Sequence, residues 1–118
     1  MSLLGARPIT RRRYGVGGYV DGYWVDGTPA LDTVDASVQV LKGRDREALP
    51  EGVRASDGRK LYLDDPTALQ TVQQSAAQRA DEVLIDGAWF VVVHVGASHP
   101  LIPHVRALVV AIPEGASA

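Results

Sequence analysis

Three histidines, His94, His99 and His104, follow one another at a regular spacing of five. Imidazole is a common zinc ligand, but a zinc site needs three or four ligands that converge on one point. A spacing of five has no recurrent metal-binding geometry on strands, and the sequence has no His-Glu-x-x-His motif. We therefore expect structural or interface histidines and no bound metal.

Two acidic pairs, Asp64-Asp65 and Asp81-Glu82, are the next candidates for chemistry. A glycosidase needs two carboxylates that converge across a cleft, whereas these pairs are predicted at turns or strand ends, where solvated acids are common. The glycine-rich residues 14–22 lack the lysine and following helix of a phosphate loop and predict a flexible bend. We expect no catalytic residues and no cofactor.

Arginines gather near the start of the chain, where Arg7, Arg11, Arg12 and Arg13 precede the first acid, Asp21. On a strand, Arg11 and Arg13 would point one way and Arg12 and Tyr14 the other, which divides the charge between two faces. One interpretation is an edge strand whose arginines prevent edge pairing or contact an acidic partner subunit. The other is contact with nucleic-acid phosphates, with Tyr14 stacking on a base. The divided charge favours the first.

The chain has 118 residues, of which 46% are hydrophobic and 22% charged, with a net charge of -2 and no cysteine. These values are typical of one globular domain, and they exclude disulfides, thiolate catalysis and Cys-ligated zinc. We find no apolar run long enough for a membrane-spanning helix and no apolar core of a signal peptide. We expect a basic arm or edge strand over residues 1–14, a single barrel domain over 15–112 and a flexible tail over 113–118.

A period of two dominates the sequence and predicts a mostly β protein. Apolar and polar residues alternate over residues 33–42, another strand is expected from Arg59, and Asp-Gly occurs four times at positions suited to tight turns. Residues 68–83 contain helix-forming residues without an amphipathic stripe, so a short helix and an ordered loop are both open. We expect a small antiparallel β-barrel or sandwich with long loops and at most one or two short helices.

Residues 80–96, "ADEVLIDGAWFVVVHVG", predict a hairpin with a two-residue turn at Asp86-Gly87. This register places Phe90, Val92 and His94 on one face and Trp89, Val91 and Val93 on the other. Because both faces are apolar, the hairpin should lie deep in a barrel or lend one face to a partner subunit. We expect it to pair with a strand after Pro103, and the predicted core consists of Val34, Ala36, Val38, Val40, Val83, Ile85, Phe90, Val92, Leu108 and Val110.

The order of three segments carries a resemblance to a known family. These segments are "ITRRRYGVGGYVDGYWVDG", "DASVQVLKGRDREALPEGVR" and "ADEVLIDGAWFVVVHVG". Together they resemble the small head-tail connector proteins of tailed bacteriophages, the head-closure or stopper proteins. The resemblance extends over roughly residues 9–110, and its most specific part is the loop that ends in Leu49-Pro50-Glu51-Gly52-x-Arg54.

The resemblance implies a β-barrel that assembles as a ring of six or twelve copies in the virion neck. During assembly the protein would be located in the host cytoplasm. Its partners would be the portal or adaptor protein on the head side and a tail protein on the tail side, with no membrane and possible non-specific contact with channel DNA. Such a protein seals the DNA channel and has no catalytic residue. The expected contact residues are Arg11, Arg12, Arg13, Tyr14, Arg44, Arg46, Leu49, Pro50, Glu51, Arg54, His99, Leu101 and Ile102.

Three alternatives stay open at this point. The first is the neighbouring tail-terminator role, the second a small β-barrel that binds single-stranded nucleic acid, and the third a metal-dependent enzyme. The sequence also leaves open whether the basic arm faces DNA or protein.

Overall fold

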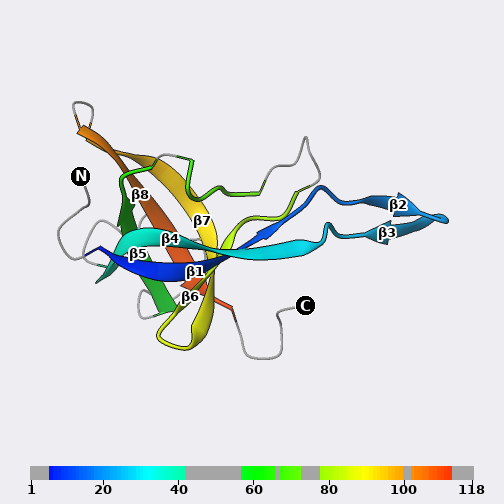
Figure 1. The fold of residues 1–118 in the computed structure, drawn as a ribbon, viewed down its shortest axis with the longest axis horizontal. Coiled ribbons are helices and arrows are strands. Elements are labelled where there is room, and N and C mark those ends of the chain that lie inside the picture. Colours follow the sequence, from blue (N-terminus) through cyan, green and yellow to red (C-terminus); the bar gives the residue numbers. More distant parts are fainter. Residues whose placement is uncertain (1–5, 42–56, 66, 73–77, 100–101, 113–118) are drawn as a thin grey trace.

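The fold is a closed β-barrel from which one hairpin projects (Figure 1). The computed structural model describes residues 6–41, 57–65, 67–72, 78–99 and 102–112. Within these residues there is no helix, which confirms the prediction of a mostly β protein. The strands are β1 (Arg7–Tyr14), β2 (Gly18–Val20), β3 (Tyr23–Val25), β4 (Pro29–Val40), β5 (Gly58–Leu63), β6 (Glu82–Ile85), β7 (Ala88–His99) and β8 (Ile102–Ala111).

Six strands form the barrel in the order β1-β4-β5-β8-β7-β6, and every described pair of neighbours is antiparallel. The barrel closes because β1 pairs with β4 on one side and with β6 on the other. The expectation of an edge strand at the start of the chain is therefore wrong. Closure uses the hydrogen-bonding groups that an edge strand would expose.

The β6-β7 hairpin has the predicted register, with Val83 opposite Phe90 and Leu84 opposite Trp89. At the turn, Asp86 has a φ of 49° and Gly87 a φ of 83°. Positive φ at both positions is the geometry of the tight turn that Asp-Gly favours. The sequence pattern therefore predicted both the turn and the pairing of this hairpin.

The barrel interior is filled by alternate residues of the six strands. Ala36, Val83, Ile85, Phe90 and Val92 are buried there as predicted, and Val34 and Val38 are partly buried against them. On β8 the prediction is right in part, because Leu108 is fully buried but Val110 is only partly buried. Val105, Ala107 and Val109, which were not predicted, belong to the core cluster. Val40, at the end of β4, is 58% exposed and lies outside the core.

The predicted position of His94, on the face of Phe90 and Val92, is also wrong. Val92 pairs with Val109 but His94 pairs with Leu108, so the register shifts by one residue between them. Such a β-bulge moves every later side chain to the opposite face. His94 is consequently exposed, and Val95 packs against the core in its place.

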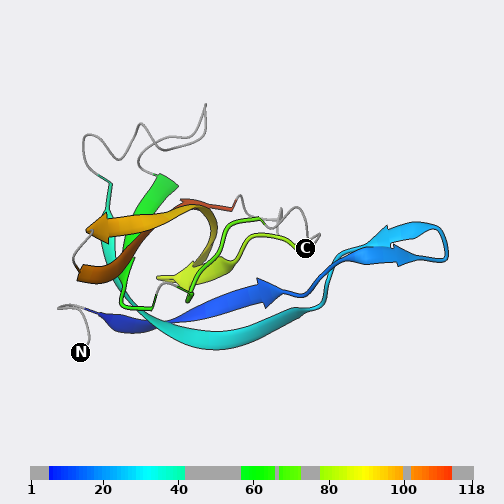
Figure 2. The same cartoon turned by 90° about the horizontal axis from the view of Figure 1, so that it is seen from above.

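The β2-β3 hairpin extends beyond the barrel as a two-stranded ribbon (Figures 1 and 2). It continues the direction of β1 and β4, whose last and first residues, Tyr14 and Pro29, still pair with each other. Among the described strands, β2 and β3 pack mainly against each other, and the molecule is elongated, at 48 × 32 × 26 Å. We call residues 15–28 the hairpin arm.

Candidate functional site

The hairpin arm is organised around a tight turn at Asp21-Gly22, where φ is 51° and 83°. Tyr19 lies opposite Trp24, and Val20 lies opposite Tyr23. The rings of Tyr19 and Trp24 meet edge to face, with centroids 5.3 Å apart, and the Trp24 indole N–H donates to Asp26 at 2.9 Å. Aromatic cross-strand pairs of this kind stabilise short hairpins, which are marginal in isolation.

Apolar exposure is concentrated on the hairpin arm. Among the described residues nine large hydrophobic side chains are exposed, and six of the nine belong to the arm, so the exposure is local. These six side chains are Val16, Tyr19, Val20, Tyr23, Trp24 and Val25. Tyr19 and Trp24 share one face of the ribbon, while Val20 and Tyr23 share the other. A ribbon that is apolar on both faces is a typical interaction surface.

The base of the arm is tied to the barrel by several contacts. The Gly15 amide donates to the Thr28 carbonyl at 3.0 Å, and the Gln78 side chain donates to the Tyr14 carbonyl at 2.5 Å. A β-bridge joins Val16 to Gln78, and the Arg79 guanidinium lies 3.5 Å from the Asp26 carboxylate. These contacts fix the direction in which the arm leaves the barrel.

The predicted basic segment forms β1, and its arginines alternate between two faces as expected. Arg11 and Arg13 point to the interior side at one end of the barrel. Arg11 binds Asp32 through two nitrogens and donates to the Ala68 carbonyl at 2.6 Å. Arg13 donates to both oxygens of Asp81, at 2.9 and 2.7 Å. Both side chains therefore hold the segment around Ala68 across this end of the barrel.

The other face of β1 carries a second cluster, in which Arg12 and Tyr14 meet Glu82. Arg12 Nε donates to the Glu82 carboxylate at 2.6 Å, and the Tyr14 hydroxyl donates to the same oxygen at 2.9 Å. The Arg12 guanidinium lies over the Trp89 ring at 4.0 Å, and that of Arg79 over the Tyr14 ring at 4.2 Å. Cation-π contacts and a shared carboxylate thus cover much of this face.

The pKa values of several groups reflect these contacts. The hydrogen bond from Arg13 to Asp81 raises the pKa of the Arg13 guanidinium. Burial, with the hydrogen bond to Glu82, raises the pKa of Tyr14. The hydrogen bond from Arg11 lowers the pKa of Asp32, and hydrogen bonds from Thr67 lower that of Asp65. These shifts favour the ionised forms of Asp32 and Asp65 and the protonated forms of Arg13 and Tyr14.

The remaining predicted contact residues cannot be placed beside these clusters. Residues 42–56, which include Arg44, Arg46, Leu49, Pro50, Glu51 and Arg54, lie outside the described residues, as does Leu101. The backbone of His99 pairs with that of Ile102, which confirms that a short loop joins β7 and β8. The structure therefore brings together Arg11, Arg12, Arg13 and Tyr14, with acids of their own chain.

The hairpin arm is assigned no contact role from the sequence, because the glycines of residues 14–22 predict a flexible bend. One signal was present in the sequence. Aromatic and β-branched residues stand on both sides of Asp21-Gly22 at every position from Tyr19 to Val25. No polar alternation interrupts them, so neither face of the predicted hairpin could be a solvated one.

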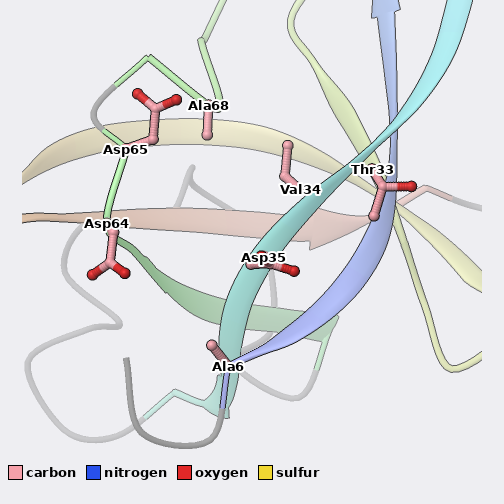
Figure 3. Close-up of a pocket in the computed structure, with 7 residues that line it drawn as sticks. All are labelled: Ala6, Thr33, Val34, Asp35, Asp64, Asp65 and Ala68. Atoms are coloured by element: carbon pink, nitrogen blue, oxygen red, sulfur yellow. The ribbon is translucent and has the colours of Figure 1, made fainter. Parts of the chain in front are cut away.

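A pocket of about 280 Å³ lies between β4 and the segment after β5. It is lined by Ala6, Thr33, Val34, Asp35, Asp64, Asp65 and Ala68. Figure 3 shows its three carboxylates pointing in different directions, and Asp65 instead accepts hydrogen bonds from the backbone and hydroxyl of Thr67. Within the described part of the chain, no cluster of three acidic or histidine side chains could hold a metal ion.

No protein-family model matches this chain, and no curated protein matches its sequence. In the described residues no helix is both long and apolar enough to cross a bilayer.

Proposed function

We propose that the chain is a structural connector of a tailed-bacteriophage virion, of the head-closure kind, which assembles as a ring between the portal or adaptor and the tail. The observation that carries the proposal is a closed barrel with a projecting hairpin that is apolar on both faces. Such a surface is suited to lasting contact with protein. The resemblance over residues 9–110 supplies the biological setting.

The arginine clusters favour a structural function over nucleic-acid binding. Arg11, Arg12 and Arg13 each contact a carboxylate of their own chain, so the positive charge of β1 is largely neutralised inside the subunit. Binding to phosphates depends on cations that are available to replace counterions. The role of β1 in the proposal is therefore to close the barrel and to hold the segment around Ala68, and DNA contact is not required of it.

The proposal is tested by complementation in vitro. A phage that carries this sequence, but with the gene interrupted, should accumulate DNA-filled heads that leak DNA and complete tails that do not join them. Purified protein added to such heads should restore joining and infectivity. Heads that keep their DNA, together with tails of abnormal length, would assign the chain to the tail-terminator role. Normal virions from the interrupted phage would overturn the proposal.

A nuclease-protection or filter-binding assay with single-stranded DNA tests the alternative. Nucleic-acid binding through β1 would weaken steeply with salt and would disappear when Arg11, Arg12 and Arg13 are changed to alanine. We expect no such binding. Instead, these substitutions should reduce the stability of the fold, because they remove the partners of Asp32, Glu82 and Asp81.

A further inference from the structure

We propose that the hairpin arms of neighbouring copies pair edge to edge, so that β3 of one arm adds an antiparallel strand to β2 of the next. This inference rests on the proposed ring assembly and names the contact that the arms make within it. The partner of each exposed strand edge is the arm of a second copy. Together the arms form one continuous antiparallel sheet around the axis of the ring.

The arm projects as a two-stranded sheet whose outer edges are open to a further strand (Figure 2). Among the described strands, β2 pairs only with β3. The tight turn at Asp21-Gly22 closes on a hydrogen-bonded pair, which is Val20 with Tyr23. Hydrogen-bonded and non-hydrogen-bonded pairs alternate along an antiparallel ladder. The backbone N–H and C=O groups of Tyr19 and Trp24 therefore point outward, where a further strand can bind them.

The two edges of the arm lack the usual protection against pairing. Natural edge strands are often protected by lysine, proline or a β-bulge. Residues 18–25 contain no lysine and no proline, and the register of β2 with β3 has no shift. Since each strand has only three residues, one edge contact supplies few hydrogen bonds. In a ring each arm is paired at both edges and its neighbours are held beside it, which makes the short contact effective.

The exposed side chains of the arm suit a neighbour on either side. Tyr19 is 76% exposed and shares a face with Trp24, while Tyr23 is 77% exposed and shares the other face with Val20. A register that keeps the faces aligned brings each of these rows beside the same row of the next arm. Aromatic and β-branched side chains on neighbouring strands stabilise each other. Edge pairing therefore continues the contact that Tyr19 and Trp24 already make within one arm.

The charge and the order of the arm favour a second arm over other partners. Residues 15–28 contain no lysine or arginine, and Asp26 pairs with Arg79, so Asp21 at the tip is the remaining charge. Nucleic-acid phosphates and anionic lipid headgroups attract cations, which the arm lacks. Copies related by rotation hold their arms in one direction, so β3 of one meets β2 of the next in antiparallel orientation. An ordered arm also loses less conformational entropy on binding than an extended peptide does.

Hydrogen exchange of the full chain, resolved to single amides, tests the pairing. In the dissociated chain, protection should alternate, with slow exchange at Val20 and Tyr23 and fast exchange at Tyr19 and Trp24. In the ring, the amides of Tyr19 and Trp24 should exchange at least about tenfold more slowly, because they become hydrogen-bonded. Arms that associate through their faces would bury side chains but keep the alternation, and that result would overturn the inference.

Two substitutions at one position separate the backbone contact from the side-chain contact. Trp24→Pro removes the outward N–H, which an edge strand tolerates, whereas Trp24→Val removes the indole but keeps the N–H. Relative to Trp24→Val, Trp24→Pro should raise the concentration for half-maximal assembly by about tenfold or more, because every contact in the ring loses a hydrogen bond. Equal concentrations for the two variants would contradict the inference. Protection of Val20 and Tyr23 in the dissociated variants shows that the arm has formed, and where it has not, the exchange of the wild-type ring decides.

Asp21 at the tip distinguishes a contact between arms from a contact with a basic surface. Asn-Gly suits the same turn, so Asp21→Asn removes the charge and keeps the hairpin. Arms that lie side by side place successive tips two strand spacings apart, about 10 Å, so their acids repel each other at low salt. Asp21→Asn should therefore lower the concentration for half-maximal assembly at low salt. An increase would indicate that the arm binds a basic surface and would contradict the inference.

The outcomes separate this inference from the proposed function. Rings in which the amides of Tyr19 and Trp24 exchange as fast as in the dissociated chain would overturn the inference and leave the proposed function standing. A wild-type chain that forms no ring, alone or with the portal protein, would overturn the proposed ring and the inference with it.

Discussion

Asp81 is fully buried, and at the residue scale its surroundings explain why β1 is rich in arginine. Its carboxylate accepts two hydrogen bonds from Arg13 and one from the Gln70 amide. A buried carboxylate needs such partners, because removing a charge from water is costly unless the charge is paired and hydrogen-bonded. Arg12 does the same for the buried carboxylate of Glu82, whereas the Asp32 carboxylate bound by Arg11 is half exposed.

We predict that Arg13→Ala lowers the free energy of unfolding by about 2 to 3 kcal/mol, because it leaves the Asp81 carboxylate buried with fewer partners. Urea denaturation at neutral pH measures this change. Arg7→Ala is the matched control on the same strand, since Arg7 meets Asp86 at 3.3 Å in an exposed pair. That control should change stability by less than about 0.5 kcal/mol. Equal losses for both variants would contradict the assigned role of Arg13.

The pH dependence of stability follows from Asp32 and Asp65, whose pKa values are lowered in the folded chain. A lowered pKa contributes stability above the ordinary value near 3.8, and this contribution is lost as the pH falls through the folded value. The urea concentration at the midpoint of unfolding should therefore decrease as the pH is lowered from 5 to 3. Asp32→Asn should make this fall slightly shallower, by less than about 1 kcal/mol because Asp32 is half exposed. A fall as steep as that of the wild type would contradict the pairing with Arg11.

At this scale the sequence predicted the alternation of Arg11, Arg12 and Arg13 but not their partners. Alternation follows from strand geometry, which is local. Asp32 faces Arg11 across the β1-β4 pair, whereas Asp81, just before β6, and Glu82, at its start, meet β1 only because the barrel closes. Such pairing depends on a topology that the residues of β1 do not encode by themselves.

At the scale of elements, the hairpin arm depends on a close approach of two chain segments at its base. A Cβ atom at Gly27 would overlap the backbone of Gly15, whereas one at Gly18 would meet no atom within 4 Å. Only glycine allows the two segments to come this close. The base of the arm is thus shaped by Gly27, and the tip by the positive φ values of Asp21 and Gly22.

We predict that Gly27→Ala loosens the arm while the barrel stays folded. Hydrogen–deuterium exchange should show faster exchange over residues 15–28, with protection of β5, β7 and β8 unchanged. Gly18→Ala, within the same arm, is the matched control and should leave the exchange rates close to those of the wild type. Loss of protection throughout the barrel in Gly27→Ala would show that the arm and the barrel are one cooperative unit, contrary to this prediction.

Strand β7 shows where the sequence pattern no longer predicts the register of a strand pair. The β6-β7 register was predictable because a two-residue Asp-Gly turn fixes which residues face each other. Beyond Val92 the bulge adds one residue to β7 and moves His94 to the other face. A run of valines carries no mark of the inserted residue, since either face can be apolar. The position of His94 therefore required the structure.

At the scale of the whole molecule, the closed barrel and the exposed hairpin arm together determine how the protein can associate. Closing the barrel removes the strand edges that cause non-specific association. The exposed apolar surface of the described residues is then largely confined to the arm, which restricts association to contacts that accept it. This combination is suited to a subunit that assembles in one geometry, as the proposed connector must.

Native mass spectrometry of the purified full-length chain, at increasing concentration and with its portal protein, tests the central claim most directly. We predict closed rings of six or twelve copies with few intermediate dimers, because each subunit gains its full stabilisation only when both of its contacts are made. A chain that stays monomeric at every concentration, and that binds neither the portal nor the tail protein, would contradict the proposed connector function.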